Sequence, residues 1–272
     1  MIRLVVSDID GTMLHDHGTS INPAYFDVIR KLQQQGIRFC VASGRQYNSL
    51  QTLFAPMKDD LIYITENGAE IVYKGKVIYS SPMTKEDSEQ LVLDTRAIPG
   101  AESMYCVGDK AYFEKADQEV FHLMKDEYHF QCEMVDDLLK LEEPCLKFSL
   151  YLKEHVDEIT DQYFTPKWRK THDVACGGKY FMDVCAQGVN KGRSLKQVQK
   201  LLGITKEETM VFGDNHNDID MMMEAAHTYA VANAREEVKQ KAAHQTLSNN
   251  KDGVLRILLN LVAPKQEIKT YV

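Results

Sequence analysis

The chain has 272 residues, of which 44% are hydrophobic and 26% are charged, and these values are typical of a globular protein. Its length allows one large domain or two modest ones. The formal net charge of −8 argues against broad nucleic-acid binding, which requires a basic face. No apolar run is long enough to span a membrane, and the N-terminal segment lacks the apolar stretch of a signal peptide. We therefore expect a cytoplasmic protein that binds neither nucleic acid nor membranes.

The first eighty residues show the pattern of a parallel sheet. A buried strand begins at residue 4, and a helix opened by Asn22 and Pro23 follows it, ending near Gly36. Residues 37–42 and 61–65 read as further buried strands, so the segment predicts βαβ units whose loops open at one edge of the sheet. Residues 70–80 predict a hairpin that turns near Lys74 and Gly75.

The middle of the chain has a different pattern of predicted helices and strands. Residues 84–98 predict a helix opened by Thr84, with Asp87 three positions later, close to a capping box. Residues 104–114 and 171–185 read as hairpins, the second turning at Gly177 and Gly178, and residues 145–153 read as a half-buried strand. This section therefore predicts an antiparallel sheet with helices.

The parallel pattern resumes after Gly188. Helices are expected over 190–203, 234–243 and 252–263, and strands over 209–214 and 227–233. A split domain explains this order better than two domains in tandem. We predict an α/β fold with a doubly wound, Rossmann-like parallel-sheet core of residues 1–82 and 186–272, and an inserted α+β cap of residues 83–185.

Two of the expected strand ends carry paired carboxylates. Asp8 and Asp10 follow the first strand, and Asp214 and Asp218 follow the strand of 209–214. Ligands of open α/β sheets bind outside the carboxyl ends of the strands, so these loops can converge. Hard oxygen ligands without Cys or His favour Mg²⁺. A cation would also offset the repulsion between carboxylates held close together.

An aspartate next to a cation suits phosphoryl chemistry. It is ionised at neutral pH and can attack phosphorus without a general base, provided that its repulsion from the phosphate is neutralised. A second aspartate two positions later could then move the proton of the leaving group. A solvated turn is the alternative for the DIDGT segment alone, because Asp and Gly are common turn residues.

Four segments in order carry a resemblance to a known family: DIDGT, VASGR, GVNKG and GDNHNDIDMM. Together with TENGA, VANAREEVKQKA and NNKDGV, they make the chain similar to the Cof-like hydrolases of the haloacid dehalogenase superfamily. The resemblance spans nearly the whole chain and is weakest in the expected cap. It implies a Mg²⁺-dependent phosphatase, a phosphoric monoester hydrolase, that acts on a small phosphorylated metabolite through an aspartyl phosphate.

The resemblance also implies roles for the first motif and its metal. Asp8 would be the nucleophile, and Asp10 would be the general acid and base. Gly11 and Thr12 would shape the turn between strand and helix. Asp214 would bind Mg²⁺ together with Asp8 and the backbone carbonyl of Asp10.

Further roles come from the other motifs in the same way. Ser43 and the amide of Gly44 would hold the transferring phosphate, with Asn217 near it. Lys191 would neutralise charge on the nucleophile and the phosphate. Asp218 would support the metal site from behind the ligands.

Several alternatives stay open at the level of sequence. Arg45 suits either a second phosphate contact or an ion pair, so we assign it only a supporting role. A phosphomannomutase-like phosphotransferase would pass the phosphoryl group to a sugar, and a receiver-like signalling module would keep it. The substrate is a sugar phosphate or a phosphorylated cofactor, and the chain is expected to be a monomer or a homodimer.

Overall fold

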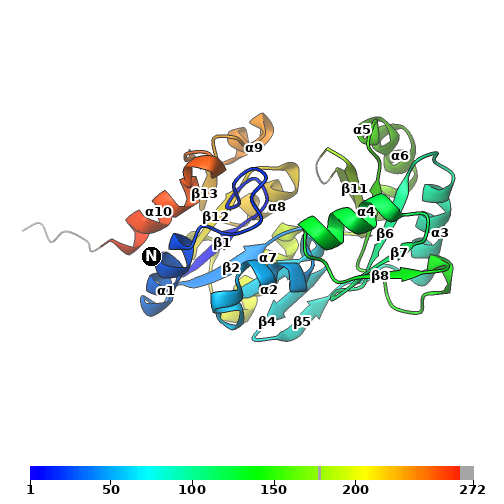
Figure 1. The fold of residues 1–272 in the computed structure, drawn as a ribbon. Coiled ribbons are helices and arrows are strands. Elements are labelled where there is room, and N and C mark those ends of the chain that lie inside the picture. Colours follow the sequence, from blue (N-terminus) through cyan, green and yellow to red (C-terminus); the bar gives the residue numbers. More distant parts are fainter. Residues whose placement is uncertain (177–178, 264–272) are drawn as a thin grey trace, which may run out of the picture.

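The computed structural model describes residues 1–176 and 179–263, and within them the chain forms two β-sheets (Figure 1). The larger sheet has eight strands in the order β14-β13-β12-β1-β2-β3-β4-β5. Pairing is parallel from β14 to β3, and β4 and β5 join as an antiparallel hairpin at the edge. The strands are β1 (Leu4–Ser7), β2 (Arg38–Ala42), β3 (Ile62–Thr65), β4 (Glu70–Tyr73), β5 (Lys76–Ser80), β12 (Thr209–Gly213), β13 (His227–Ala230) and β14 (His244–Gln245).

The smaller sheet has six strands in the order β10-β11-β9-β6-β7-β8. Its strands are β6 (Glu102–Cys106), β7 (Ala111–Glu114), β8 (Cys132–Val135), β9 (Lys147–Tyr151), β10 (His172–Cys176) and β11 (Phe181–Ala186). The expected antiparallel pairing holds except between β7 and β8, which run parallel. A helical crossover joins these two strands, and a crossover of this kind returns the chain in the same direction.

Helices surround both sheets. The α-helices are α1 (Ala24–Gln34), α2 (Tyr47–Leu53), α3 (Lys85–Arg96), α4 (Gln118–His122), α5 (Val156–Ile159), α6 (Thr165–Trp168), α7 (Lys191–Leu202), α8 (Ile219–Met223), α9 (Glu236–Lys241) and α10 (Gly253–Val262). Thr84 begins α3 as expected, because its hydroxyl accepts a hydrogen bond from the amide of Asp87 at 3.1 Å. In the described part of the chain, none of these helices has the length and apolar character needed to cross a bilayer.

The core of the larger sheet agrees with the central place of β1 in it. Leu4, Val5 and Val6 of β1 are fully buried, as expected for a central strand that is covered on both faces. Helix α1 packs on α10, and α7 packs on α8. The sheet therefore holds the end of β1 rigidly, and the first aspartate of the DIDGT segment follows directly at Asp8.

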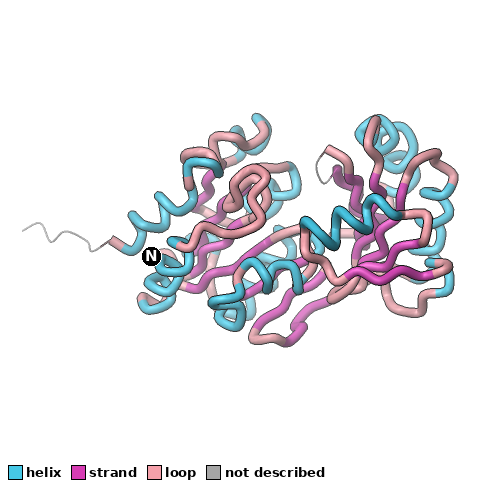
Figure 2. The backbone as a smooth tube through the Cα atoms, viewed as in Figure 1, coloured by secondary structure: helices cyan, strands magenta, loops and turns pink. Residues whose placement is uncertain are grey.

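The predicted fold class is confirmed: the chain is an α/β protein with a parallel-sheet core and an inserted α+β region. Figure 2 shows the strands of the two sheets as two groups that loops connect. The domain boundaries at residues 82/83 and 185/186 stay a prediction. The turn expected at Gly177 and Gly178 lies outside the described residues.

Gly68 provides a test of how tightly the loop after β3 is packed. Its φ is +103°, and a Cβ there would lie 2.5 Å from the carbonyl oxygen of Asn190, just before α7. Gly75 has a φ of +68° but has nothing within 4 Å of its Cβ position. We expect Gly68→Ala to lower the free energy of unfolding by about 2–4 kcal/mol, because it adds overpacking to backbone strain.

The matched control is Gly75→Ala, which adds backbone strain alone and should cost only about 1 kcal/mol. Urea unfolding followed by circular dichroism measures both values. Equal losses in the two variants would contradict the close approach of this loop to α7.

Candidate active site

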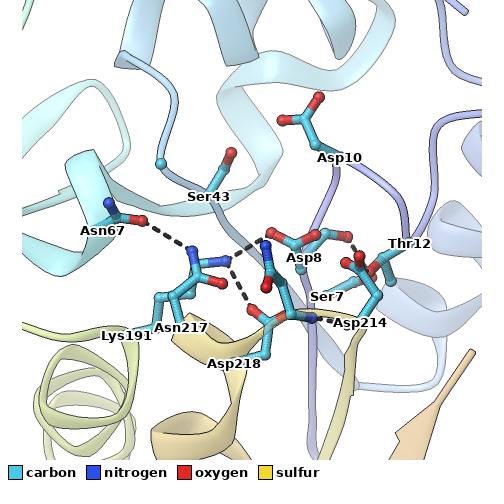
Figure 3. Close-up of polar contacts among 12 residues, drawn as sticks. Ser7, Asp8, Asp10, Thr12, Ser43, Asn67, Lys191, Asp214, Asn217 and Asp218 are labelled. Atoms are coloured by element: carbon cyan, nitrogen blue, oxygen red, sulfur yellow. Dashed lines mark hydrogen bonds and ion pairs between the residues drawn. The ribbon is translucent and has the colours of Figure 1, made fainter. Parts of the chain in front are cut away.

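Four loops bring polar side chains to one edge of the larger sheet. Asp8 follows β1, Ser43 follows β2, Glu66 follows β3 and Asp214 follows β12. Because these four strands are parallel, their carboxyl ends lie at the same edge. The start of α7 adds Lys191 to the group, which Figure 3 shows in detail.

Lys191 lies at the centre of this group. Its ammonium is 2.6 Å from Oδ1 of Asp8 and 2.7 Å from Oδ1 of Asp218, and only 1% of the side chain is exposed (Figure 3). Burial opposes its charge, but the carboxylates of Asp218 and Asp8 raise the pKa of Lys191 above its ordinary value. Lys191 is therefore a buried ammonium that holds two carboxylates in place.

Asp218 has both oxygens occupied within the protein. One accepts from Lys191, and the other accepts from the backbone amides of Asp214 and Asn215 at 2.9 and 3.0 Å. The side chain is fully buried. Asp218 thus shapes the loop after β12 and orients Lys191, an arrangement that suits the supporting role predicted for it better than direct metal binding.

Asp8 and Asp214 form the acidic side of the site. Carboxylate oxygens of Asp8, Asp214 and Asp218 all lie within 4.8 Å of one another. Burial raises the pKa of Asp8, and Lys191 lowers it in part. Burial and the charge of Asp218 raise the pKa of Asp214 to about 7. One lysine does not balance these carboxylates, so the site has the charge and the hard oxygen donors that fit Mg²⁺.

The turn after β1 fits closely around Asp214. The hydroxyl of Thr12 donates to Oδ1 of Asp214 at 2.8 Å. Gly11 has a φ of +77°, and a Cβ there would lie 2.5 Å from Oδ2 of Asp214. Glycine is required at this position for both reasons. The structure therefore brings Gly11 and Thr12 against the candidate metal ligand.

Asp10 points away from Asp8 (Figure 3). Its carboxylate accepts two hydrogen bonds from Arg45, from Nε at 2.8 Å and from Nη2 at 2.5 Å. The guanidinium of Arg45 also lies 4.6 Å from the ring centroid of Tyr128, which belongs to the inserted region. Of the two alternatives for Arg45, a phosphate contact or an ion pair, the structure shows the ion pair. The carboxylate of Asp10 is therefore not brought to Asp8.

The predicted phosphate-binding residues line a cleft with Asp8 and Asp214. The hydroxyl of Ser43 accepts from the amide of Arg45 at 3.1 Å, and Gly44 follows it. Asn217 donates to the side chain of Asn67 at 3.0 Å (Figure 3). Asn67 has no predicted role, although its place in the loop just after the third parallel strand was a usable signal.

The cleft, whose volume of about 710 Å³ includes space open to solvent, lies between the larger sheet's loops and the inserted region. Its far wall is mostly apolar and comes from the inserted region; the apolar residues are Met104, Met124, Tyr128, Phe130 and Phe181. Two polar side chains, Lys147 and Asp183, interrupt this wall. Sequence patterns did not identify these residues, because the same residue types are common in cores and on surfaces that bind no ligand.

Comparisons with a family model, with related sequences and with solved structures agree on the family of this chain. Residues 5–258 match the family model of the haloacid dehalogenase-like hydrolases. The chain is 32% identical over 260 residues to the 5-amino-6-(5-phospho-D-ribitylamino)uracil phosphatase YbjI of Escherichia coli, covering 94% of this chain and 95% of that protein. It is 25% identical over 262 residues to the phosphatase YcsE of Bacillus subtilis, which has the same substrate in its name, with 96% of each chain covered.

A crystal structure from Eubacterium rectale superposes with a TM-score of 0.86 at 34% identity, covering 96% of this chain and 99% of the other. The chain belongs to the haloacid dehalogenase-like hydrolases, and it is a phosphatase of this family, a phosphoric monoester hydrolase. The family resemblance found in the sequence is confirmed.

The raised pKa of Asp214 predicts how pH and Mg²⁺ act on stability. Asp214 has a folded-state pKa of about 7, against an ordinary value of 3.8. Between about pH 4 and pH 7 the folded state therefore holds a proton that the unfolded chain has lost, and the free energy of unfolding falls as the pH rises. Without divalent cations, we expect the Tm to drop between about pH 5 and pH 7.5.

Mg²⁺ should raise the Tm more at the higher pH, because a cation binds the ionised carboxylate. Thermal unfolding with Mg²⁺ and with a chelator measures both effects. The Asp214→Asn variant is the control and should show a weaker pH dependence than the wild type, although the raised pKa of Asp8 still contributes. An equal Mg²⁺ effect at both pH values would argue against this carboxylate as a ligand.

Proposed function

We propose that the protein is a Mg²⁺-dependent phosphatase that hydrolyses a small phosphorylated metabolite through a phosphoryl group carried on Asp8. The observation that carries this proposal is the buried Asp8 carboxylate, held at 2.6 Å by Lys191 beside Asp214 in a cleft that opens to solvent. The cytoplasmic location expected from the sequence is part of the same proposal.

The proposed reaction has two displacements at phosphorus. The free oxygen of Asp8 attacks the phosphorus of the monoester, and the bond from phosphorus to the ester oxygen breaks. Asp10, whose carboxylate is paired with Arg45, must first leave Arg45 and take up a proton from solvent, which it then gives to the departing alcohol. Asp10 then takes a proton from water, which attacks the phosphoryl group and restores Asp8 with release of inorganic phosphate.

The remaining residues balance charge and hold the phosphate. Asp8 and Asp214, with the backbone carbonyl of Asp10, would hold Mg²⁺, which neutralises charge on the phosphate when bound. Lys191 keeps its positive charge next to the nucleophile, so an anionic substrate can approach Asp8. Ser43, the Gly44 amide and Asn217 line the cleft and are the groups that we propose for the phosphate oxygens, because each of them can donate a hydrogen bond.

The apolar wall of the cleft supports a substrate with a planar or apolar leaving group. The aromatic side chains Tyr128, Phe130 and Phe181 stand where the part of the substrate beyond the phosphate would lie. Such side chains bury and stack against rings, whereas a bare polyol gains little from them. The relatives YbjI and YcsE are named for a phosphate ester that carries a uracil ring. A ring-bearing phosphate is therefore our first candidate, ahead of a simple sugar phosphate.

The phosphotransferase alternative differs only in the acceptor of the phosphoryl group. Incubation with a hexose phosphate separates the two functions: a phosphatase releases inorganic phosphate, and a mutase forms an isomeric sugar phosphate. The relatives described above are named as phosphatases, which favours transfer to water. The signalling alternative lost its support once the chain proved to be a member of an enzyme family.

Replacement of the nucleophile tests the mechanism. We expect Asp8→Asn to lower the Mg²⁺-dependent kcat on an aryl phosphate by more than about 10³-fold, because an amide lacks the carboxylate oxygen needed to form the acyl phosphate. Phosphate release measured by a colorimetric assay gives kcat, and circular dichroism verifies the fold.

The control Asp27→Asn changes a carboxylate that is 77% exposed on α1, and it should keep wild-type activity. Undiminished turnover in Asp8→Asn would overturn the mechanism.

The apolar wall predicts the order of substrates. The kcat/KM should be higher for the uracil-bearing ribityl phosphate than for a hexose phosphate, and lowest for glycerol phosphate. Phe181→Ala should lower kcat/KM for the ring-bearing substrate by about 10-fold and leave glycerol phosphate nearly unchanged, because only a ring contacts this wall. Phe181→Leu is the conservative control. An equal loss for all three phosphates would show that Phe181 does not contact the leaving group.

A further inference from the structure

A second buried lysine, Lys147, connects the inserted region to the loops of the larger sheet. It is the first residue of β9, and only 3% of it is exposed. Its ammonium donates to the backbone carbonyl of Gly44 at 2.6 Å and pairs with Glu66 at 2.9 Å. Asp183 on β11 lies 3.8 Å away. Lys147 therefore belongs to the smaller sheet, whereas two of its three partners, Gly44 and Glu66, lie in loops of the larger sheet.

The contact with Gly44 determines the direction of a peptide group. In a trans peptide, the carbonyl and the following N–H point in opposite directions. Lys147 holds the carbonyl of Gly44, so the amide of Arg45 points the other way, where it donates to the hydroxyl of Ser43 at 3.1 Å. The carbonyl of Ser43 is held in the same manner by the amide of Asn67 at 3.1 Å, and this orients the amide of Gly44.

Asp183 and Glu66 keep Lys147 charged and in place. Burial opposes the charge, but both carboxylates raise the pKa of Lys147 above its ordinary value. Asp183 accepts from Ser149 at 2.5 Å and from Asn67 at 2.7 Å, and Asn67 in turn accepts from Asn217 at 3.0 Å. A continuous set of polar contacts thus runs from the smaller sheet to the phosphate side of the cleft.

We infer that Lys147 is a positioning residue, which orients the phosphate-binding loop of Ser43 and Gly44 from the inserted region. This inference rests on the proposed phosphatase function. Because Lys147 contacts the loop that binds the phosphate group, its effect on phosphate binding is the same for every substrate. The inserted region then serves the reaction itself as well as the choice of leaving group.

A direct contact between Lys147 and the leaving group is the alternative, because the side chain also lines the cleft. Inorganic phosphate distinguishes the two roles, since it has no leaving group. A residue that contacts only the leaving group leaves the affinity for inorganic phosphate unchanged. A residue that orients the phosphate loop changes it.

The experiment is titration calorimetry of inorganic phosphate into the full chain with Mg²⁺ present. We expect Lys147→Met to raise the Kd for phosphate by about 10- to 100-fold, the range for loss of a hydrogen bond to a charged group. The control Lys110→Met removes an exposed lysine of the same inserted region, which pairs with Glu133 at 3.0 Å, and it should leave the Kd unchanged. An unchanged Kd in folded Lys147→Met would overturn the inference.

A second pair of variants covers the case in which Lys147→Met does not fold, since it leaves two carboxylates buried without their cation. Glu66→Met keeps Lys147 next to Gly44 and Asp183, whereas Lys147→Met with Glu66→Met removes the ion pair as a unit. The double variant should bind phosphate at least about 10-fold more weakly than Glu66→Met; equal affinities would contradict the inference. A wild-type chain that neither hydrolyses phosphate esters nor binds phosphate would overturn the proposed function as well.

Discussion

The ion pairs of Lys191 with Asp8 and Asp218 are the interaction on which the rest of the site depends. They are buried at the end of the central strand β1, where an unpaired charge would be costly. Removing one partner of a buried ion pair typically costs about 3–5 kcal/mol. The lysine allows the Asp8 carboxylate, which we propose as the nucleophile, to remain buried at the end of the central strand.

Lys191 stabilises the site but leaves part of its negative charge unbalanced. With Asp8, Asp214 and Asp218 within 4.8 Å, the negative charge exceeds the positive charge. A divalent cation would offset this excess and would attract a phosphate to the same place. The pairing of Asp10 with Arg45 keeps the carboxylate of Asp10 apart from these three aspartates, and Arg45 connects that pair to Tyr128 of the inserted region.

The sequence predicted the parts of this arrangement that follow from strand order. Asp8, Ser43 and Asp214 could be placed together because they follow parallel strands, and Lys191 because it begins a helix in a matching motif. The orientation of Asp10 toward Arg45 was beyond prediction, since two side-chain directions are equally compatible with the spacing of two residues. Lys147 was missed because nothing local marks a lysine that begins a strand as buried; its partners Gly44 and Glu66 are some eighty to one hundred residues away in the chain.

The most direct test of the central claim is a rapid-quench experiment with a ³²P-labelled substrate, followed by peptide mapping of the chain. The account predicts a transient phosphoryl group on the peptide that contains Asp8, at up to one per chain. It predicts none in Asp8→Asn and much less in Lys191→Met, where the carboxylate loses its cation. Label on a different residue, or steady turnover without any labelled peptide, would contradict the account.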